Sequence, residues 1–166
     1  MLSIEEKVSF LKNVTSFKSL NAAQLETLAE MCREKTYAIG EKIFSQGDTD
    51  GALYIVVEGQ VTLEREIRSQ TDTVSLTLVK PGNYVGEISL FHDAPRSVTA
   101  TAIKKTVALK LNNDDFSSFA VKNPDLLVEL NHILCQRLIE AYDKISEVTE
   151  QDKPRELRKL YDKLDF

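Results

Sequence analysis

The sequence has little of what metal centres, disulfide frameworks and membrane spans are built from. Its 166 residues include two histidines and two cysteines, and no uninterrupted apolar run approaches the length of a membrane-spanning helix. His92 and His132 are too few for a multi-histidine catalytic metal site. We therefore expect a protein without a metal, a cofactor or a membrane span.

The two cysteines, Cys32 and Cys135, lie far apart in segments that have the pattern of helices, with no CxxC or ligand-like spacing around them. The first residues, Met1 to Lys7, carry acids instead of a basic region that leads into an apolar segment, so they do not resemble a secretion signal. We expect both cysteines to be buried thiols, and the protein to be cytoplasmic.

An excess of positive charge is also missing. The 26 acidic and 21 basic side chains give a net charge of -5, and the resulting field repels a nucleic acid backbone. Nucleic acid is therefore not an expected partner. A chain of 166 residues is long enough for one domain with one core. We assign residues 1–150 to that domain and residues 151–166, which contain Pro154, to a charged helical tail.

Near the start of the chain, apolar residues recur at three- and four-residue spacing, which predicts two amphipathic helices. The first covers residues 4–11 and the second covers residues 22–32, with Asn21 as a plausible N-cap of the second.

From Lys35 to Leu111 the pattern is typical of short strands separated by turn residues such as Gly59 and Pro81-Gly82. Residues 53–57 are apolar enough for a strand that is buried on both faces. Residues 74–79 alternate between apolar and polar, which predicts a half-buried strand. Many short strands at this spacing favour a jelly-roll-like barrel or sandwich.

Beyond Asn112 the helical pattern returns. Asp114 and Asp115 fit the first turn of a helix, and Asn123-Pro124-Asp125 is the start signal of a long one. The apolar residues on one face of this long helix are Leu127, Leu130, Leu134, Leu138, Ala141, Ile145 and Val148. This stripe can dock on the barrel, pair with a second copy, or do both, because the step from Leu134 to Leu138 breaks a strict heptad.

One segment carries a cluster of chemically distinctive residues: Gly86-Glu87-Ile88-Ser89-Leu90-Phe91, followed by Pro95-Arg96-Ser97-Val98-Thr99. Gly86 lets a ligand approach the backbone, and a short turn that opens at Glu87 would aim amide groups outward as an anion site. Arg96 supplies a planar fork that matches two phosphate oxygens. Glu87 suits a sugar hydroxyl beside that phosphate, because a carboxylate only accepts hydrogen bonds. Together these groups indicate a site for a ribose phosphate.

These two motifs resemble the phosphate-binding cassette of the cyclic nucleotide-binding domain family, which includes kinase regulatory subunits, gated channels and bacterial catabolite-activator proteins. The similarity extends upstream through Gly40, Gly47-Asp48, residues 53–56 and Gly59. The resemblance implies an α+β fold: a jelly-roll-like β-roll of about eight strands, flanked by N-terminal helices and a long C-terminal helix.

By position, the resemblance places Glu87 on the ribose 2′-hydroxyl, and Arg96 with the Ser89 amide on the cyclic phosphate. Ser97 would lie beside the phosphate or a syn guanine. It stands where cyclic-AMP-binding kinase subunits carry alanine and cyclic-GMP-binding ones carry threonine, so the choice between cAMP and cGMP stays open. Tyr142 could stack on the base as a lid. The expected binding residues are Gly86, Glu87, Ile88, Ser89, Arg96, Ser97, Val98, Leu76, Thr77 and Tyr142, with Leu76 and Thr77 as a wall beneath the base.

We therefore expect a receptor for a cyclic nucleotide monophosphate, cAMP before cGMP, that relays binding through its C-terminal helices to a protein partner or a second copy. The alternative is a nucleotide-free scaffold whose helices are the working surface, with Arg96 and Glu87 forming a structural ion pair. An enzyme is not expected, because no nucleophile and base arrangement is present. Since only one charged helix follows the long one before Phe166, the chain either contacts a partner directly or is a fragment of something longer.

Overall fold

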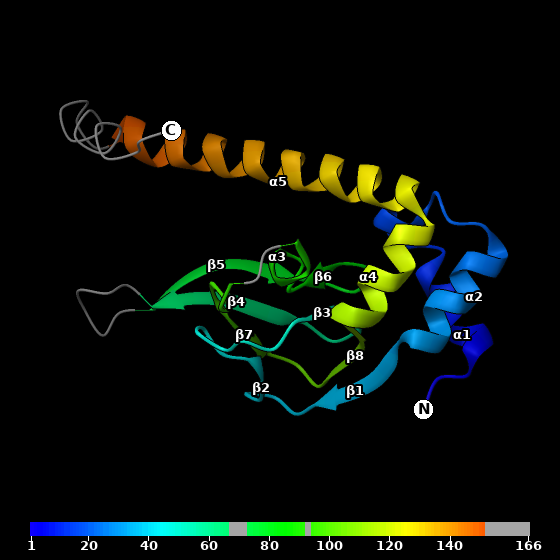
Figure 1. Ribbon diagram of the computed structural model, residues 1–166. Coiled ribbons are helices and arrows are strands. Elements are labelled where there is room, and N and C mark those ends of the chain that lie inside the picture. The colour runs from blue at the N-terminus through cyan, green and yellow to red at the C-terminus, as the bar shows by residue number, and fades with distance from the viewer. Residues whose placement is uncertain (67–72, 92–93, 152–166) are drawn as a thin grey trace. The chain divides into compact units, whose positions relative to one another are not determined.

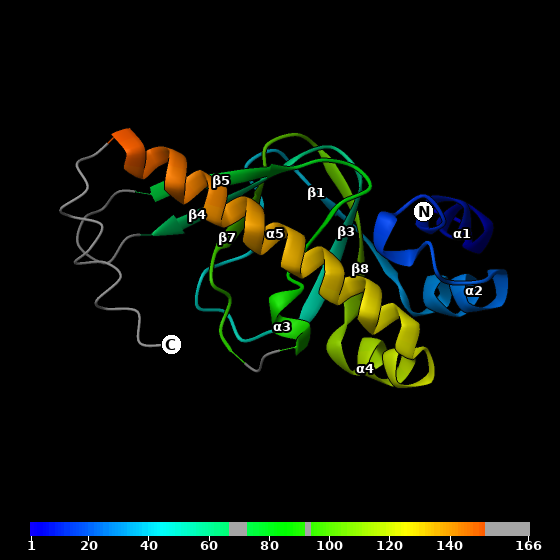
Figure 2. The same ribbon diagram turned by 90° about the horizontal axis from the view of Figure 1, so that it is seen from above.

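Two four-stranded sheets form the centre of the computed structural model, which describes residues 1–66, 73–91 and 94–151 (Figures 1 and 2). It separates into two units, Met1–Leu126 and Leu127–Phe166. The described elements are α1 (Ile4–Leu11), a 3-10 turn (Thr15–Phe17), α2 (Ala22–Met31), β1 (Arg33–Tyr37), β2 (Lys42–Phe44), β3 (Ala52–Glu58), β4 (Val61–Glu66), β5 (Thr73–Val79), β6 (Tyr84–Val85), α3 (Ile88–Phe91), β7 (Thr99–Ala102), β8 (Thr106–Asn112), α4 (Asn113–Lys122) and α5 (Pro124–Gln151).

The N-terminal helices form where their caps predict. The Asn21 side chain accepts a hydrogen bond from the Gln24 amide at 3.0 Å, while the Gln24 side chain accepts one from the Asn21 amide at 2.7 Å. This reciprocal capping box satisfies donors that the first turn of α2 leaves without helical partners. The prediction of two helices over residues 4–11 and 22–32 is confirmed, with Cys32 as the C-cap of α2.

The two sheets have the strand orders β1-β8-β3-β6 and β2-β7-β4-β5, and every strand pair in them is antiparallel. The predicted roll of about eight strands is therefore confirmed within the described residues. Between the sheets lies an apolar core that includes Tyr54 and Val56 from the first sheet and Val61 and Ala100 from the second.

Strand β3 is buried on both faces, as predicted for residues 53–57. Tyr54 and Val56 face the core between the sheets, and the alternate residues Leu53 and Ile55 are also fully buried on the opposite face. They pair with Leu111 and Leu109 of β8. Because both faces of this strand are removed from water, it provides a rigid support for the residues at its ends.

The prediction of a half-buried strand over residues 74–79 is wrong in its burial pattern. Leu76 and Leu78 are 48% and 50% exposed, whereas Val79 is buried. Leu78 pairs with Thr62 in regular register and lies on the face opposite to Val79, which belongs to the core. A bulge follows: Leu63 pairs with Thr77, but the next residue, Glu64, pairs with Ser75, so Leu76 is an extra residue in β5. In addition, β5 is the last strand in the order of its sheet, so among the described strands it pairs only with β4.

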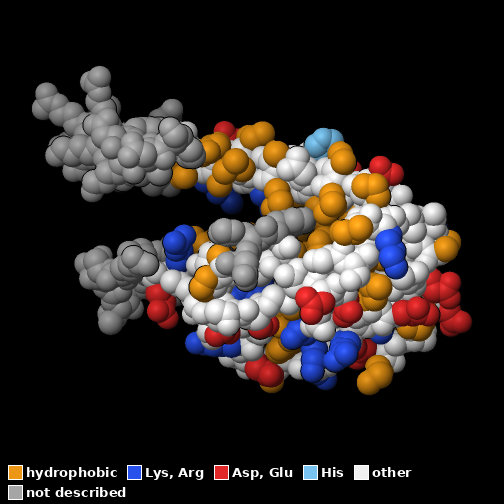
Figure 3. All heavy atoms as spheres, viewed as in Figure 1, with side chains coloured by type: hydrophobic (Ala, Val, Ile, Leu, Met, Phe, Trp, Pro, Cys, Tyr) orange, Lys and Arg blue, Asp and Glu red, His pale blue; other side chains and the backbone are white. Residues whose placement is uncertain are grey.

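The long helix α5 begins at Pro124, as the start signal predicts, and carries exposed apolar residues along its described length (Figure 3). Leu138, Ile139, Tyr142 and Ile145 are each at least half exposed. Cys32 is buried as expected, but Cys135 on α5 is exposed, so the prediction of two buried thiols is wrong for Cys135. The predicted tail, apart from Gln151, lies outside the described residues.

Among the described residues, none of the helices combines the length and the apolar character that crossing a membrane requires.

Candidate functional site

Arg96 is the central residue of the site, and its backbone fixes it to the turn that precedes β3. The Arg96 amide donates to the Asp48 carbonyl at 2.7 Å, and the Gly47 amide donates to the Arg96 carbonyl at 2.9 Å. The segment after α3 is thereby attached to the Gly47-Asp48 turn, which lies almost fifty residues earlier in the chain. This long-range pairing determines the direction in which the Arg96 side chain leaves the backbone.

The Arg96 guanidinium is buried and donates to four protein acceptors. Nε donates to Asp50 Oδ1 at 3.3 Å, and Nη2 donates to the Ala52 carbonyl at 2.8 Å. Nη1 donates to the Gly86 carbonyl at 3.2 Å and to Ser89 Oγ at 3.1 Å. Since a guanidinium has five N–H groups, these bonds use most of its capacity. A buried cation is costly without such partners, so this network explains how Arg96 can be 3% exposed.

Aromatic rings complete the environment of the guanidinium. Its central carbon lies 4.3 Å from the centroid of the Phe44 ring and 5.9 Å from that of Tyr54. The Tyr54 hydroxyl also donates to Asp50 at 3.3 Å. Burial raises the pKa of Tyr54 above its ordinary value, the nearby Asp50 carboxylate and Tyr37 raise it further, and the Arg96 charge partly offsets the rise. Tyr54 therefore remains a neutral hydrogen-bond donor to Asp50 at physiological pH.

Gly86 lies where no other residue fits without displacement. A Cβ at this position would lie 2.5 Å from Arg96 Nη1 and 2.6 Å from the Ala52 carbonyl oxygen. Its φ of +89° is also in the region that side-chain-bearing residues rarely adopt. The glycine thus allows the backbone before α3 to approach Arg96 closely.

Seven of the predicted site residues line a single cavity of about 120 Å³, which we call the cassette cavity: Gly86, Glu87, Ile88, Ser89, Arg96, Ser97 and Val98. Apolar side chains, including Phe44 and Leu63, form other parts of its lining. Neither residue was among the predicted site residues, because an apolar side chain in the core and one in a pocket give the same pattern in the sequence. The fold brings the two halves of the predicted motif together.

The other three predicted site residues have a different position. Leu76 and Thr77 lie on β5 and are exposed, and neither is among the described residues that line the cassette cavity. Thr77 does pair with Leu63, which lines it. Tyr142 lies on α5 in the second unit and is 53% exposed. A role for these three residues in binding stays a prediction.

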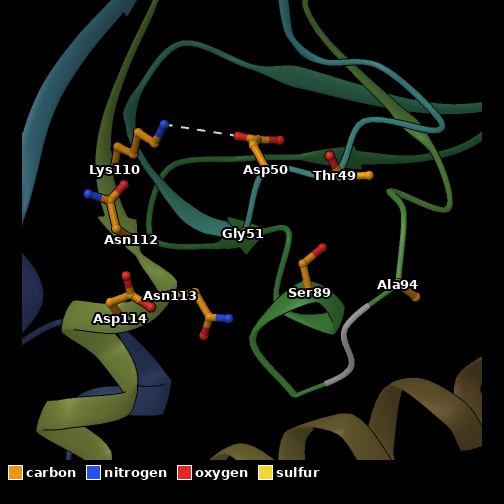
Figure 4. Close-up of a pocket in the computed structure, with 9 residues that line it drawn as sticks. All are labelled: Thr49, Asp50, Gly51, Ser89, Ala94, Lys110, Asn112, Asn113 and Asp114. Carbon is orange, nitrogen blue, oxygen red and sulfur yellow. Dashed lines mark ion pairs between the residues drawn. The ribbon is translucent and has the colours of Figure 1, made fainter.

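A second and larger cavity, of about 410 Å³, contains mostly polar groups; we call it the polar cavity (Figure 4). Asp50, Lys110 and Asp114 supply charges, and the Lys110 ammonium lies 4.0 Å from Asp50 Oδ2. Ser89 lines this cavity as well as the cassette cavity. Asp50 was not among the predicted site residues, although it follows closely on Gly47-Asp48, a pair that belongs to the family pattern.

Comparison with known proteins agrees with this geometry. The sequence profile described as "Cyclic nucleotide-binding domain" matches residues 34–123, which is more than half of the chain. The match contains both halves of the predicted motif and the residues of β3 that support Arg96.

Curated relatives include regulators and kinases. The chain is 24% identical over 86% of its length to a CRP-like cAMP-activated global transcriptional regulator of Mycobacterium tuberculosis, of which it spans 63%. It is 33% identical over 79% of its length to the cyclic AMP receptor protein of Thermus thermophilus, of which it spans 60%. A cGMP-dependent protein kinase of Plasmodium berghei is 29% identical over 96% of this chain, which spans 17% of that kinase.

Solved structures give the same result for the fold. The catabolite activator protein of Thermus thermophilus superposes with a TM-score of 0.74 at 30% identity, covering 81% of this chain and 63% of that one. The N-terminal domain of a transcriptional regulator from Streptomyces coelicolor superposes with a TM-score of 0.66, also at 30% identity, and covers 82% of this chain and 94% of that domain. The profile match, these relatives and the shared fold show that the chain belongs to the cyclic nucleotide-binding domain family, a family of regulatory domains.

Proposed function

We propose that this chain is a receptor for a cyclic nucleotide monophosphate, with cAMP preferred over cGMP, and that it has no catalytic activity. The observation that carries the proposal is the cassette cavity, in which a buried arginine, a carboxylate and two serine hydroxyls meet beside apolar side chains. Arg96 and Glu87 differ in charge, so one suits a phosphate and the other suits a sugar hydroxyl. The preference for cAMP is supported by the relatives that are named for it.

A cyclic phosphate suits this site better than a linear one. A cyclic monophosphate carries one negative charge, whereas a terminal phosphate monoester approaches two at neutral pH. The Glu87 and Asp50 carboxylates lie near the Arg96 cation, so each additional ligand charge is opposed by two acids and balanced by one buried base. We therefore expect the site to discriminate against AMP.

The output of the receptor is proposed to pass through α5. Ligand contact with the amides and side chains of α3 would shift Leu90 and Phe91, and α5 would change its position in response. Tyr142 is proposed to cover the base, with Leu76 and Thr77 beneath it. If α5 gave the same distances to a label on β3 with and without ligand, for example in pulsed electron spin resonance, this relay would be excluded.

The nucleotide-free scaffold is the second candidate, and one observation favours it. Arg96 already satisfies four of its donors with protein acceptors, so the site does not need an anion to compensate the buried charge. The scaffold predicts that the pocket is structural and that the exposed apolar residues of α5 carry the activity.

Calorimetric titration with cAMP, cGMP and AMP distinguishes the two candidates. The receptor predicts saturable binding of cAMP, weaker binding of cGMP, and little binding of AMP. Arg96→Lys keeps the charge but loses the fork, and should weaken cAMP binding by at least about tenfold. Glu87→Ala removes the partner of the 2′-hydroxyl without removing buried charge, so it should bind cAMP and 2′-deoxy-cAMP with nearly equal affinity. Absence of binding by the folded wild-type protein would favour the scaffold.

A further inference from the structure

A third cavity, a groove of about 370 Å³, lies at the end of β1; we call it the edge groove. It is lined by Thr36, Tyr37, Ala38, Ile39 and Lys105, and shares no lining residue with the cassette cavity or the polar cavity. Four of these residues are consecutive, so the groove follows the chain as it leaves β1. Among the described strands, β1 pairs only with β8. The edge groove therefore lies at an open edge of the first sheet.

Two exposed isoleucines stand at this edge on adjoining turns. Ile39 is 73% exposed and Ile103 is 40% exposed. Their chain neighbours are paired: the Gly40 amide donates to the Ala102 carbonyl at 2.7 Å, and the Ala102 amide donates to the Glu41 carbonyl at 2.9 Å. This pairing fixes the two turns against each other. A partner that covers both isoleucines gains the free energy of removing apolar surface from water.

Three exposed lysines, Lys42, Lys104 and Lys105, surround the isoleucines in the chain. Within residues 1–66, 73–91 and 94–151, no carboxylate lies within ion-pair distance of any of them. Of the acids in this region, Glu41 already accepts from a backbone amide at 2.7 Å, and Glu58 ends β3, which β8 separates from β1. Figure 3 shows basic side chains gathered with hydrophobic ones at the lower edge of the first unit. The groove is thus bordered by positive charge, although the chain has a net charge of -5.

We propose that the edge groove binds an extended acidic segment of a partner protein. An apolar side chain of that segment contacts Ile39 and Ile103, and its carboxylates pair with Lys42, Lys104 and Lys105. An extended segment fits because the groove follows a strand edge, whose free main-chain groups can pair with an added strand. A nucleic acid would complement the lysines, but its backbone offers no apolar side chain to the isoleucines. The inference does not depend on the proposed receptor function, since the groove and the cassette cavity have no residue in common.

The test selects peptides from a phage-displayed random library on the full chain, and maps the bound peptide by amide chemical shifts. The selected peptides should be rich in aspartate and glutamate and should contain a large apolar residue. Their binding should shift the resonances of residues 36–39 and 103–105. It should also weaken as the salt concentration rises, because exposed charges are screened.

The apolar contact is tested by Ile39→Asp, which should weaken binding of a selected peptide by at least about tenfold, as expected for loss of an anchor residue. Val121→Asp, a similar change at a position on α4 that is 81% exposed, is the matched control and should leave the affinity within about twofold.

The charge contact is tested by the double variant Lys104→Glu with Lys105→Glu, which should also weaken binding by at least about tenfold and reduce its dependence on salt. The control is Lys12→Glu with Lys18→Glu, two exposed positions near the N-terminal helices. It changes the net charge equally, so it separates a local contact from the overall field. All four variants change exposed side chains and should keep the wild-type melting temperature.

Several results would overturn the inference. These are selected peptides without acids whose binding does not respond to salt, peptides that shift only resonances elsewhere, such as those of α5, and a selection that yields no binding peptide. Groove resonances that shift with protein concentration alone would show that a second copy covers the groove, and would overturn it as well. Titration of the wild type with cAMP decides the receptor function separately.

Discussion

The two cavities that meet at Ser89 differ in both size and charge environment. The polar cavity is the larger, at about 410 Å³ against about 120 Å³, and it has more charged side chains on its lining. Its charges are partly solvated, however: the Asp50 and Lys110 side chains are 44% and 26% exposed. The cassette cavity holds a guanidinium that is almost fully buried. A buried charge interacts much more strongly with a ligand than a solvated one does, so the smaller cavity is the better candidate for binding an anion.

The largest expected effect comes from adding a side chain at Gly86, where the backbone lies close against Arg96. Gly86→Ala should lower the free energy of unfolding by about 3 kcal/mol, because the new methyl group meets Arg96 and Ala52 and the backbone is in a left-handed conformation. Gly82→Ala is the matched control. Gly82 has a similar φ of +83° but no neighbouring atom within 4 Å, so only the conformational cost of about 1–2 kcal/mol applies. Urea unfolding measures both. Equal losses would show that Gly86 has no packing role.

The next effect tests whether Asp50 neutralises the buried cation. Asp50→Asn keeps the shape but removes the charge that faces Arg96 Nε at 3.3 Å, so it should cost about 1–2 kcal/mol of stability, a value reduced by the exposure of Asp50. Asp143→Asn, the same change at an exposed position on α5, should cost less than about 0.5 kcal/mol. If the two variants unfold at the same urea concentration, Arg96 is sufficiently satisfied by neutral acceptors.

A third prediction concerns alkaline pH. Burial raises the pKa of Cys32 from 9.0 to about 12, and burial, with Glu41 and Asp50 nearby, raises the pKa of Tyr37 from 10.0 to about 12. Above pH 9 the unfolded chain therefore loses protons that the folded protein retains. Stability should be constant with respect to these groups below pH 9 and should fall as the pH rises from 9 to 12. Thermal melts across this range test it, and Cys32→Ala should make the decline shallower. An unchanged slope would contradict the role of Cys32.

The smallest effect on stability is expected in the polar cavity, where the Asp50 and Lys110 side chains are partly exposed to water. Lys110→Met removes an ammonium that lies 4.0 Å from Asp50 and 5.6 Å from the centroid of the Tyr54 ring; the Lys110 and Asp50 side chains are both partly exposed. Such pairs contribute little, so the free energy of unfolding should change by less than about 1 kcal/mol. A larger loss than that of Asp50→Asn would reverse the comparison between the cavities, since it would make the polar cavity the energetically important one.

The residues of the site could be predicted from the sequence more completely than the contacts that these residues make. Gly86, Glu87 and Arg96 could be selected because glycine, carboxylate and guanidinium are chemically distinctive and lie close together in the chain. Asp50 and Ala52, which hold Arg96, could not be selected, because they precede it by more than forty residues and their pairing depends on the Gly47-Asp48 turn meeting the segment after α3. Residue type identifies a candidate group, but its partners depend on contacts between distant segments.

For the secondary structure too, features with local signals could be predicted from the sequence, whereas features that depend on distant segments could not. The capping box of α2 and the buried strand β3 were predictable because their signals are local: a cap lies within four residues of its partner, and a strand buried on both faces is apolar throughout. The exposure of Leu76 could not be predicted from the sequence, because it depends on a bulge against β4 and on the position of β5 in its sheet. What the sequence alone determined about this protein was its family pattern and the chemistry it contains. Only the tertiary structure decided which charges are buried and what satisfies them, because burial and hydrogen-bond partners come from residues that meet only after folding.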